Sequence, residues 1–157
     1  MAKELVEGAK APAFTLPTDG EGSVKLKDYA GKTLVLYFYP KDDTSGCTKQ
    51  AIGFSEHLAD FESAGAEILG VSKDTVAKHD KFKAKHDLTI TLGSDEEGKA
   101  LEAYGVWKEK SMYGKKYMGI ERSTFVIDGK GVIQQVWRKV KVPGHVEAVL
   151  EAVEALG

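Results

Sequence analysis

The segment that most constrains the fold is KTLVLYFYP, residues 32–40, a continuous apolar run that ends at a proline. Its length and its valine, tyrosine and phenylalanine content favour a β-strand over a helix. Because apolar and polar residues do not alternate in this run, we expect a strand that is buried on both faces. A chain with such a strand needs structural layers that cover both sides of a sheet.

Helical and strand-like patterns alternate along the rest of the chain. Residues 12–31 are predicted to form two short strands around a Gly/Asp turn. A helix is predicted beyond residue 47, where four apolar residues fall at helical spacing and Gly65 provides a stop; they are Ala51, Phe54, Leu58 and Phe61. Further strands are predicted at residues 66–72 and 89–94, and helices at 74–87 and 95–105.

The last third of the chain changes this pattern. Residues 122–138 predict a β-hairpin with an Asp-Gly turn, and an amphipathic helix follows with Val146, Val149, Leu150 and Val153 on its apolar face. Residues 107–120 are less regular and rich in Lys, Met and Tyr, so we expect a functional loop or an extended arm. The order of elements predicts one α/β domain over residues 1–157, with three layers and a central mixed sheet.

Composition excludes several classes of protein. A net charge of −2 argues against general nucleic-acid binding, and no apolar run approaches the length of a membrane helix. The N-terminal MAKELVEGAK has no long hydrophobic region, so no secretory signal is expected. The single cysteine cannot form an internal disulfide, which suits a reducing compartment, and we expect the protein in the cytoplasm. The four histidines lack metal-ligand spacing and are predicted to lie on the surface.

The single cysteine, Cys47, follows the strand of residues 32–40 and sits where the next helix begins. The carboxyl ends of strands in open α/β sheets are where ligand and catalytic groups gather, and a helix N-terminus favours a thiolate. Thr44 and Ser45 are suitable N-cap residues, and Gly46 permits a close approach of substrate. Free cysteines are nevertheless often inert and buried. The residues alone therefore leave two alternatives, a space-filling cysteine and an activated thiol without an assigned substrate.

The pattern Pro40-x-x-x-Thr44-x-x-Cys47 resembles the peroxidatic-site motif of peroxiredoxins. YFYPKDDTSGCTKQ is similar to the strand-to-helix segment of the bacterioferritin comigratory protein subfamily, also called peroxiredoxin Q. GIERSTFVIDGKG resembles the segment that carries the active-site arginine of that family, here Arg122, and VWRKVKVPGH resembles its last strand and the entry to its final helix. The resemblance implies a thioredoxin-like fold with an N-terminal β-hairpin extension. It also implies reduction of hydrogen peroxide and organic hydroperoxides without metal, haem or flavin.

The resemblance also implies a role for each matched residue. Cys47 is the expected nucleophile, which becomes a sulfenic acid, and Arg122 is expected to lie against its thiolate. Thr44 is expected to give a hydroxyl to the thiolate and the substrate, and Pro40 to shield the sulfur. The backbone N–H groups of Gly46 and Cys47 are expected to donate to the peroxide.

The sequence departs from the family at three positions. Ser45 stands where many relatives carry proline, and Gln50 where the family often has glutamate, so we expect Arg122 to be less neutralised and to act more strongly on Cys47. Ile52 stands where many relatives carry a resolving cysteine, and HDKFKAKHD, the other usual location, has none. We therefore expect a one-cysteine peroxidase that an external thiol must reduce, from thioredoxin, glutaredoxin or glutathione. The subfamily resemblance favours a monomer or a weak dimer.

Two other functions fit a single reactive cysteine. One is a peroxide sensor or binding module that forms a mixed disulfide with a partner, with KEKSMYGKKYMG either as its docking surface or as an ordinary lysine-rich surface loop. The other is a monothiol transferase acting on glutathione adducts. The sequence disfavours it because Cys47 is followed by Thr-Lys-Gln and not by a Gly-Phe-Ser-like signature. Steady-state consumption of peroxide distinguishes an enzyme from a sensor.

Overall fold

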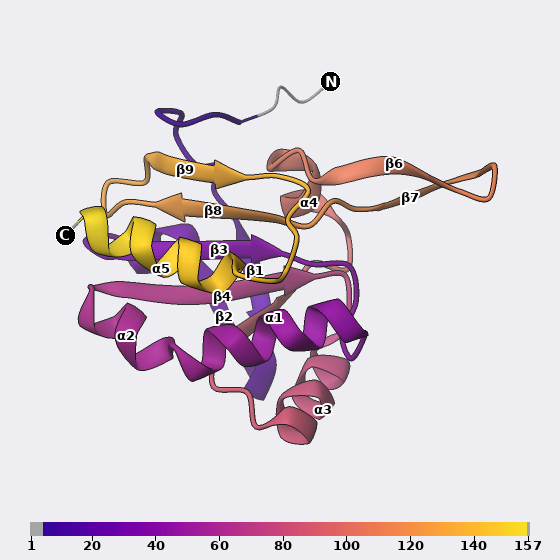
Figure 1. The fold of residues 1–157 in the computed structure, drawn as a ribbon, viewed down its shortest axis with the longest axis horizontal. Helices are drawn as coiled ribbons and strands as arrows, with labels where there is room; N and C mark the ends of the chain where they lie inside the picture. The colour runs from indigo at the N-terminus through magenta and orange to yellow at the C-terminus, as the bar shows by residue number, and fades with distance from the viewer. Residues whose placement is uncertain (1–4, 157) are drawn as a thin grey trace.

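A computed structural model describes residues 5–156, and its centre is a seven-stranded mixed sheet (Figure 1). The strand order is β2-β1-β5-β4-β3-β8-β9. Strands β3, β4 and β5 are parallel, whereas β8 and β9 on one side and β1 and β2 on the other are antiparallel. Their bounds are β1 Thr15–Thr18, β2 Gly22–Lys25, β3 Thr33–Phe38, β4 Ala66–Ser72, β5 Thr91–Ser94, β8 Ser123–Ile127 and β9 Ile133–Trp137.

The central strand β3 supplies side chains to both faces of the sheet, as its uninterrupted apolar sequence predicts. Val35 and Tyr37 belong to one buried cluster, whereas Leu34, Leu36 and Phe38 belong to the other. This division follows from the two-residue period of a strand, which turns successive side chains to opposite faces. Two separate cores therefore hold β3 in place, and its carboxyl end is a rigid support for the segment that follows.

Four helices contribute to the first core and one to the second. Helices α1 (Ser45–Glu56), α2 (Leu58–Ser63), α3 (Val76–His86) and α5 (His145–Leu156) pack with Val35 and Tyr37, whereas α4 (Lys99–Ala103) packs with Leu36 and Phe38. Two 3₁₀ helices, η1 (Asp19–Glu21) and η2 (Leu26–Tyr29), flank β2. The predicted three-layer α/β arrangement with a mixed sheet is confirmed, as is the N-terminal hairpin β1–β2 at the sheet edge.

Residues 107–120 form a two-stranded arm that projects from the body (Figure 1). Strands β6 (Trp107–Met112) and β7 (Lys115–Ile120) pair along their whole length, so the expected arm is regular rather than irregular. Tyr113 and Gly114 both have positive φ at the turn, which matches the type of tight turn that fits the twist of a hairpin. The two strands were not predicted because strand prediction relies on alternating apolar residues, and an arm outside the core does not need an apolar face.

The surface prediction for the histidines is wrong at two of the four positions. His79 and His145 are buried, because polar partners inside the fold satisfy their ring nitrogens. Nδ1 of His79 lies 2.6 Å from a carboxylate oxygen of Asp42, and Nε2 of His145 lies 2.8 Å from the Thr124 hydroxyl. No helix within residues 5–156 is both long and apolar enough to cross a bilayer.

Candidate active site

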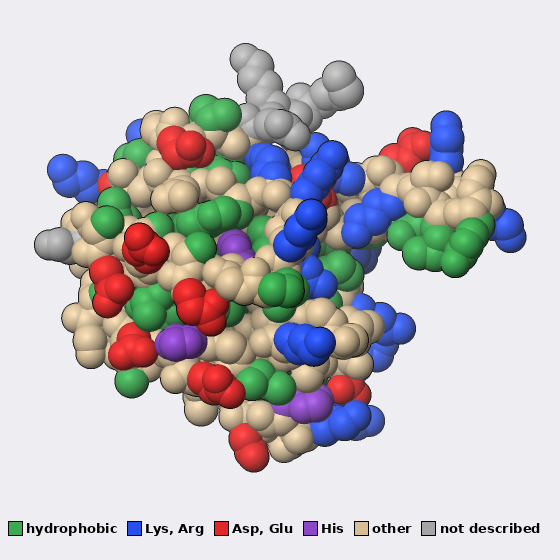
Figure 2. Space-filling model, in the orientation of Figure 1, with side chains coloured by type: hydrophobic (Ala, Val, Ile, Leu, Met, Phe, Trp, Pro, Cys, Tyr) green, Lys and Arg blue, Asp and Glu red, His purple; other side chains and the backbone are tan. Residues whose placement is uncertain are grey.

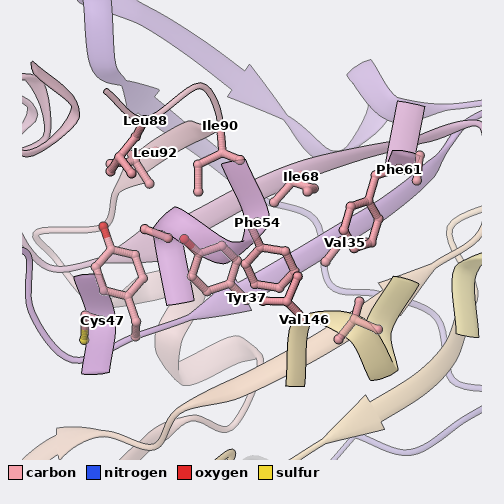
Figure 3. Packing of buried hydrophobic residues seen from close by; sticks show 14 of the residues in the cluster. Val35, Tyr37, Cys47, Phe54, Phe61, Ile68, Leu88, Ile90, Leu92 and Val146 are labelled. Atoms are coloured by element: carbon pink, nitrogen blue, oxygen red, sulfur yellow. The ribbon is translucent and has the colours of Figure 1, made fainter. Parts of the chain in front are cut away.

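Cys47 lies in the first turn of α1, immediately after the loop that leaves β3. Thr44 is the N-cap of this helix in an extended conformation, and the N–H of Thr48 bonds back to the Thr44 carbonyl at 2.8 Å. The N–H groups of the preceding residues, Cys47 included, therefore lie in the turn that has no intrahelical acceptor. The thiol is 1 % exposed, and Figure 3 shows Cys47 at one end of the buried cluster that contains Tyr37 and Phe54. Burial alone would suit an inert cysteine, so its neighbours decide between the alternatives.

Arg122 brings a cation to the buried thiol from a distant part of the sequence. The β3–β8 register pairs Phe38 with Ser123, so Arg122 lies just beyond the pairing, next to the exit of β3. Its Nη2 donates to Cys47 Sγ at 3.2 Å, and its Nη1 donates to Gln50 Oε1 at 2.6 Å. The guanidinium fork is thus fixed by two acceptors on successive turns of α1. A fixed cation at this distance is positioned to stabilise negative charge on the sulfur.

Gly46 makes the approach of Arg122 possible. A Cβ atom at this position would lie 3.2 Å from Nη2 of Arg122, closer than ordinary van der Waals contact. Its backbone is ordinary helix, so the requirement for glycine here is one of space rather than of dihedral angle. The residue expected to lie near the substrate therefore also sets how closely the guanidinium approaches α1.

Gln50 is completely buried and faces Arg122 with its acceptor oxygen. Its Nε2 has no hydrogen-bond partner among residues 5–156. The guanidinium of an arginine has only hydrogen-bond donors, so the oxygen of the Gln50 amide can bond to it and the nitrogen cannot. Gln50 therefore orients the guanidinium without adding a negative charge to the site.

The other two matched residues, Thr44 and Pro40, are exposed. The Thr44 hydroxyl donates to the Lys41 carbonyl at 2.8 Å, so in this conformation it closes the loop rather than reaching Cys47. Pro40 and Arg122 both line an open cavity of about 420 Å³, and Cys47 is not among its lining residues. Arg122 therefore both lines the cavity and contacts the buried thiol.

The base of the β6–β7 arm forms another wall of this cavity, through Lys108, Glu109 and Lys110. Lys110 Nζ donates to the Ile120 carbonyl at 2.5 Å. Burial, followed by the neighbouring charge of Arg122, lowers the pKa of Lys110. The site is thus rich in cations at the opening as well as at the sulfur.

Sequence reasoning missed two polar groups beneath the site. His145 is buried beside Thr124, and burial, with Arg122 as the next cause, lowers its pKa to about 4. Tyr39, Asp42 and His79 form a buried network in which Asp42 accepts from the Tyr39 hydroxyl and pairs with His79. The N–H of Asp42 also donates to Asp74 Oδ2 at 2.8 Å, which ties the loop before Cys47 to the end of β4. No local pattern predicts the contacts of Asp42 with His79 and Asp74, because these residues are 37 and 32 positions away from it.

Comparisons with known proteins agree with this geometry. The family model described as "AhpC/TSA family" matches residues 8–136. The chain is 54 % identical over 143 residues to a putative peroxiredoxin bcp of Coxiella burnetii, covering 91 % of this chain and 95 % of the relative. It is 51 % identical over 147 residues to the peroxiredoxin Bcp of Bacillus subtilis, covering 94 % of each chain.

A solved structure of the bacterioferritin comigratory protein of Xanthomonas campestris superposes with a TM-score of 0.89 at 45 % identity, covering 99 % of each chain. That protein has alkyl peroxide reduction activity. The likeness extends over the sheet, the helices and the arm, and it confirms the predicted thioredoxin-like architecture.

Proposed function

The chain belongs to the AhpC/TSA family of peroxiredoxins, and we propose that it is a thiol-dependent peroxidase that reduces hydrogen peroxide and organic hydroperoxides through Cys47. The observation that carries this proposal is the contact of Arg122 Nη2 with Cys47 Sγ, at 3.2 Å, in the first turn of a helix. A thiol kept only to fill space needs no cation oriented on it. Alkyl peroxide reduction by the Xanthomonas campestris relative supports organic hydroperoxides as substrates.

In the proposed reaction the Cys47 thiolate attacks the terminal oxygen of the hydroperoxide. The S–O bond forms as the O–O bond breaks, so the sulfur is oxidised to a sulfenic acid and the peroxide is reduced. The other oxygen leaves as an alkoxide or hydroxide and takes a proton from solvent to become an alcohol or water. Negative charge therefore moves from the sulfur to the leaving oxygen during the step.

Arg122 is the group best placed to stabilise this negative charge, first on the sulfur and then on the leaving oxygen. Its guanidinium donates to the thiolate before reaction and lies at the cavity through which the peroxide enters. Donors oriented in advance at the position of a developing oxyanion lower the barrier without reorganisation. We assign the same task to the backbone N–H groups of Gly46 and Cys47, which point out of the first turn of α1.

The remaining residues position these groups. Gln50 holds the second arm of the guanidinium, and Gly46 leaves room for it. Pro40 shapes the cavity wall. Thr44 is proposed to turn its hydroxyl from the Lys41 carbonyl toward the incoming peroxide, a rotation about one side-chain bond.

An external thiol must complete the cycle, because Cys47 is the only cysteine in the sequence. The thiol condenses with the sulfenic acid to give a mixed disulfide and water. A second thiol then reduces the mixed disulfide and restores Cys47. We propose thioredoxin, glutaredoxin or glutathione as the source, a monomer as the working form, and the cytoplasm as the compartment, since a lone thiol suits a reducing environment.

The test is steady-state consumption of hydrogen peroxide and of cumene hydroperoxide with thioredoxin, thioredoxin reductase and NADPH, and separately with glutathione and glutaredoxin. The proposal predicts sustained turnover with at least one thiol system and none with Cys47→Ser. Turnover without any added thiol would contradict the one-cysteine cycle. A single stoichiometric oxidation that no thiol system can reverse would indicate a peroxide sensor instead.

A further inference from the structure

The β6–β7 arm carries most of the strongly exposed large hydrophobic residues of the described chain. Six large hydrophobic residues of residues 5–156 are strongly exposed, and four of them lie on this arm: Met112, Tyr113, Tyr117 and Met118. Tyr113, at the turn, is 99 % exposed. Figure 2 shows hydrophobic side chains gathered on one side of the projection, with Lys or Arg side chains beside them. Apolar patches of this kind on a small protein mark interaction surfaces.

The strand register divides the arm into two faces of different charge. Lys110 lies opposite Tyr117, and Met112 lies opposite Lys115, so these four side chains share one face together with Lys108, which lies opposite Gly119. We call this set the basic face. It carries three lysines and no acidic residue. The opposite face holds Glu109 and Lys116, whose charged groups lie 3.6 Å apart.

The basic face continues into the cavity of the active site. Lys110 and Tyr117 lie side by side, since a Cβ atom on Gly119 would meet Cδ of Lys110 at 3.2 Å and the ring of Tyr117 at 3.4 Å. Lys108 and Lys110 also line the cavity that Arg122 and Pro40 border. A molecule that covered the basic face would therefore also reach the cavity where Arg122 lies, and Arg122 contacts Cys47.

We propose that the basic face of the arm is the docking surface for a protein thiol reductant whose thiol is surrounded by acidic and apolar residues. The inference rests on the proposed function, in which an outside thiol must reach a buried sulfenic acid. Charge complementarity favours an acidic partner, because the arm has four lysines and one glutamate although the whole chain has a net charge of −2. The tyrosine and the methionine supply the apolar contact that holds a docked partner.

Docking would hold the partner's thiolate at the cavity mouth, where it attacks the Cys47 sulfur. The S–S bond forms as the S–O bond breaks, and hydroxide leaves and becomes water with a proton from solvent. The second thiol of the partner then attacks the mixed disulfide, which releases the Cys47 thiolate and leaves the partner oxidised. A dithiol protein therefore closes the cycle without a third component.

The test compares two charge reversals of equal size on the two faces, Lys115→Glu on the basic face and Lys116→Glu on the opposite face. Cys47 is first converted to its mixed disulfide with thionitrobenzoate, which labels one site because the sequence has one cysteine. Release of thionitrobenzoate is then followed with reduced thioredoxin of negative net charge, with glutathione, and with dithiothreitol. This reaction needs no peroxide, so it can fail or succeed independently of the peroxidase proposal.

We expect Lys115→Glu to slow the reaction with thioredoxin about 5- to 10-fold at low ionic strength, and the difference to shrink at high salt. Lys116→Glu should change this rate less than about 2-fold, and neither variant should alter the reaction with dithiothreitol. Thermal unfolding of both variants should match the wild type, since both lysines are exposed.

Three results would overturn the proposal. Equal effects of the two reversals would indicate net charge rather than a docking face. An equal slowing of glutathione and thioredoxin by Lys115→Glu would indicate a site for small anionic thiols. A dimer in light scattering that Lys115→Glu dissociates, with an unchanged thioredoxin rate, would make the basic face a contact between two copies of this chain. Failure of reduced Cys47 to react with peroxide would instead contradict the proposed function.

Discussion

Replacing Arg122 with methionine removes the cation next to Cys47 and retains much of the side-chain length. The wild-type guanidinium makes one hydrogen bond to Cys47 Sγ and one to Gln50 Oε1. A hydrogen bond to a charged group contributes about 1.5–3 kcal/mol. If the whole contribution to the sulfur is expressed in the transition state, the rate constant for peroxide falls about 10- to 150-fold, since 1.36 kcal/mol corresponds to a factor of ten.

The same substitution leaves the oxygen of Gln50 buried without its donor. An unsatisfied buried group costs about 1–3 kcal/mol of stability, so Arg122→Met alone confounds a stability effect with a kinetic one. The double variant Arg122→Met, Gln50→Leu removes both partners and is the matched control. Arg122→Lys keeps the charge but cannot serve both acceptors in fixed geometry, so it should fall between wild type and Arg122→Met.

The assay is rapid mixing of the reduced protein with hydrogen peroxide, followed by quenching and mass spectrometry of Cys47, at pH 7 and at pH 9. A loss of rate that is equal at the two pH values reports on the transition state. Thermal unfolding of each variant checks the fold. A rate for Arg122→Met and for the double variant within about 3-fold of wild type at both pH values would refute the role of Arg122.

Three further predictions concern single residues around this centre. Gly46→Ala should slow the peroxide reaction several-fold, because the added Cβ would push against Arg122. The free energy of unfolding should stay equal or rise, since alanine is favoured over glycine in a helix by about 0.5–1 kcal/mol. Equal reaction rates in the variant and the wild type would contradict the need for space at this position. Gln50→Glu should slow alkylation of Cys47 by iodoacetamide at pH 6, because the new carboxylate neutralises Arg122, and a faster reaction would contradict this. For His145, the pKa is lowered to about 4, so the unfolded chain binds the proton first as pH falls. Between pH 7.5 and 4.5 the free energy of unfolding, measured with urea, should therefore drop by about 1–2 kcal/mol more in wild type than in His145→Gln, and parallel pH profiles would contradict this.

The sheet and most helices follow from patterns that act over a few residues. The run at 32–40 predicted a strand buried on both faces, and β3 has that environment because it lies between two cores. The predicted hairpin at 122–138 and the closing helix appear as β8, β9 and α5. The single helix predicted from Ala51 to Phe61 is instead two helices, α1 and α2, which meet at His57. The helical spacing of the apolar residues continues across this break, so the sequence pattern does not reveal it.

The candidate active site could be predicted only in part. The physics of the sequence indicated Cys47 at a helix start, whereas Arg122 was identified through the family resemblance. Cys47 and Arg122 are 75 positions apart, so no pattern over a few residues predicts their contact. The antiparallel pairing of β3 and β8 brings them together. The buried His79 and His145 were missed for the same reason. Their partners, Asp42 and Thr124, become neighbours only in the folded chain.

The rate of reaction between Cys47 and hydrogen peroxide tests the central claim most directly. It can be measured by stopped flow on the fully reduced wild-type protein, with Cys47→Ser as the control. We predict a second-order rate constant about 100-fold or more above that of a free thiol such as dithiothreitol at the same pH, and the addition of one oxygen atom to Cys47. A rate constant no higher than that of the free thiol would contradict the account.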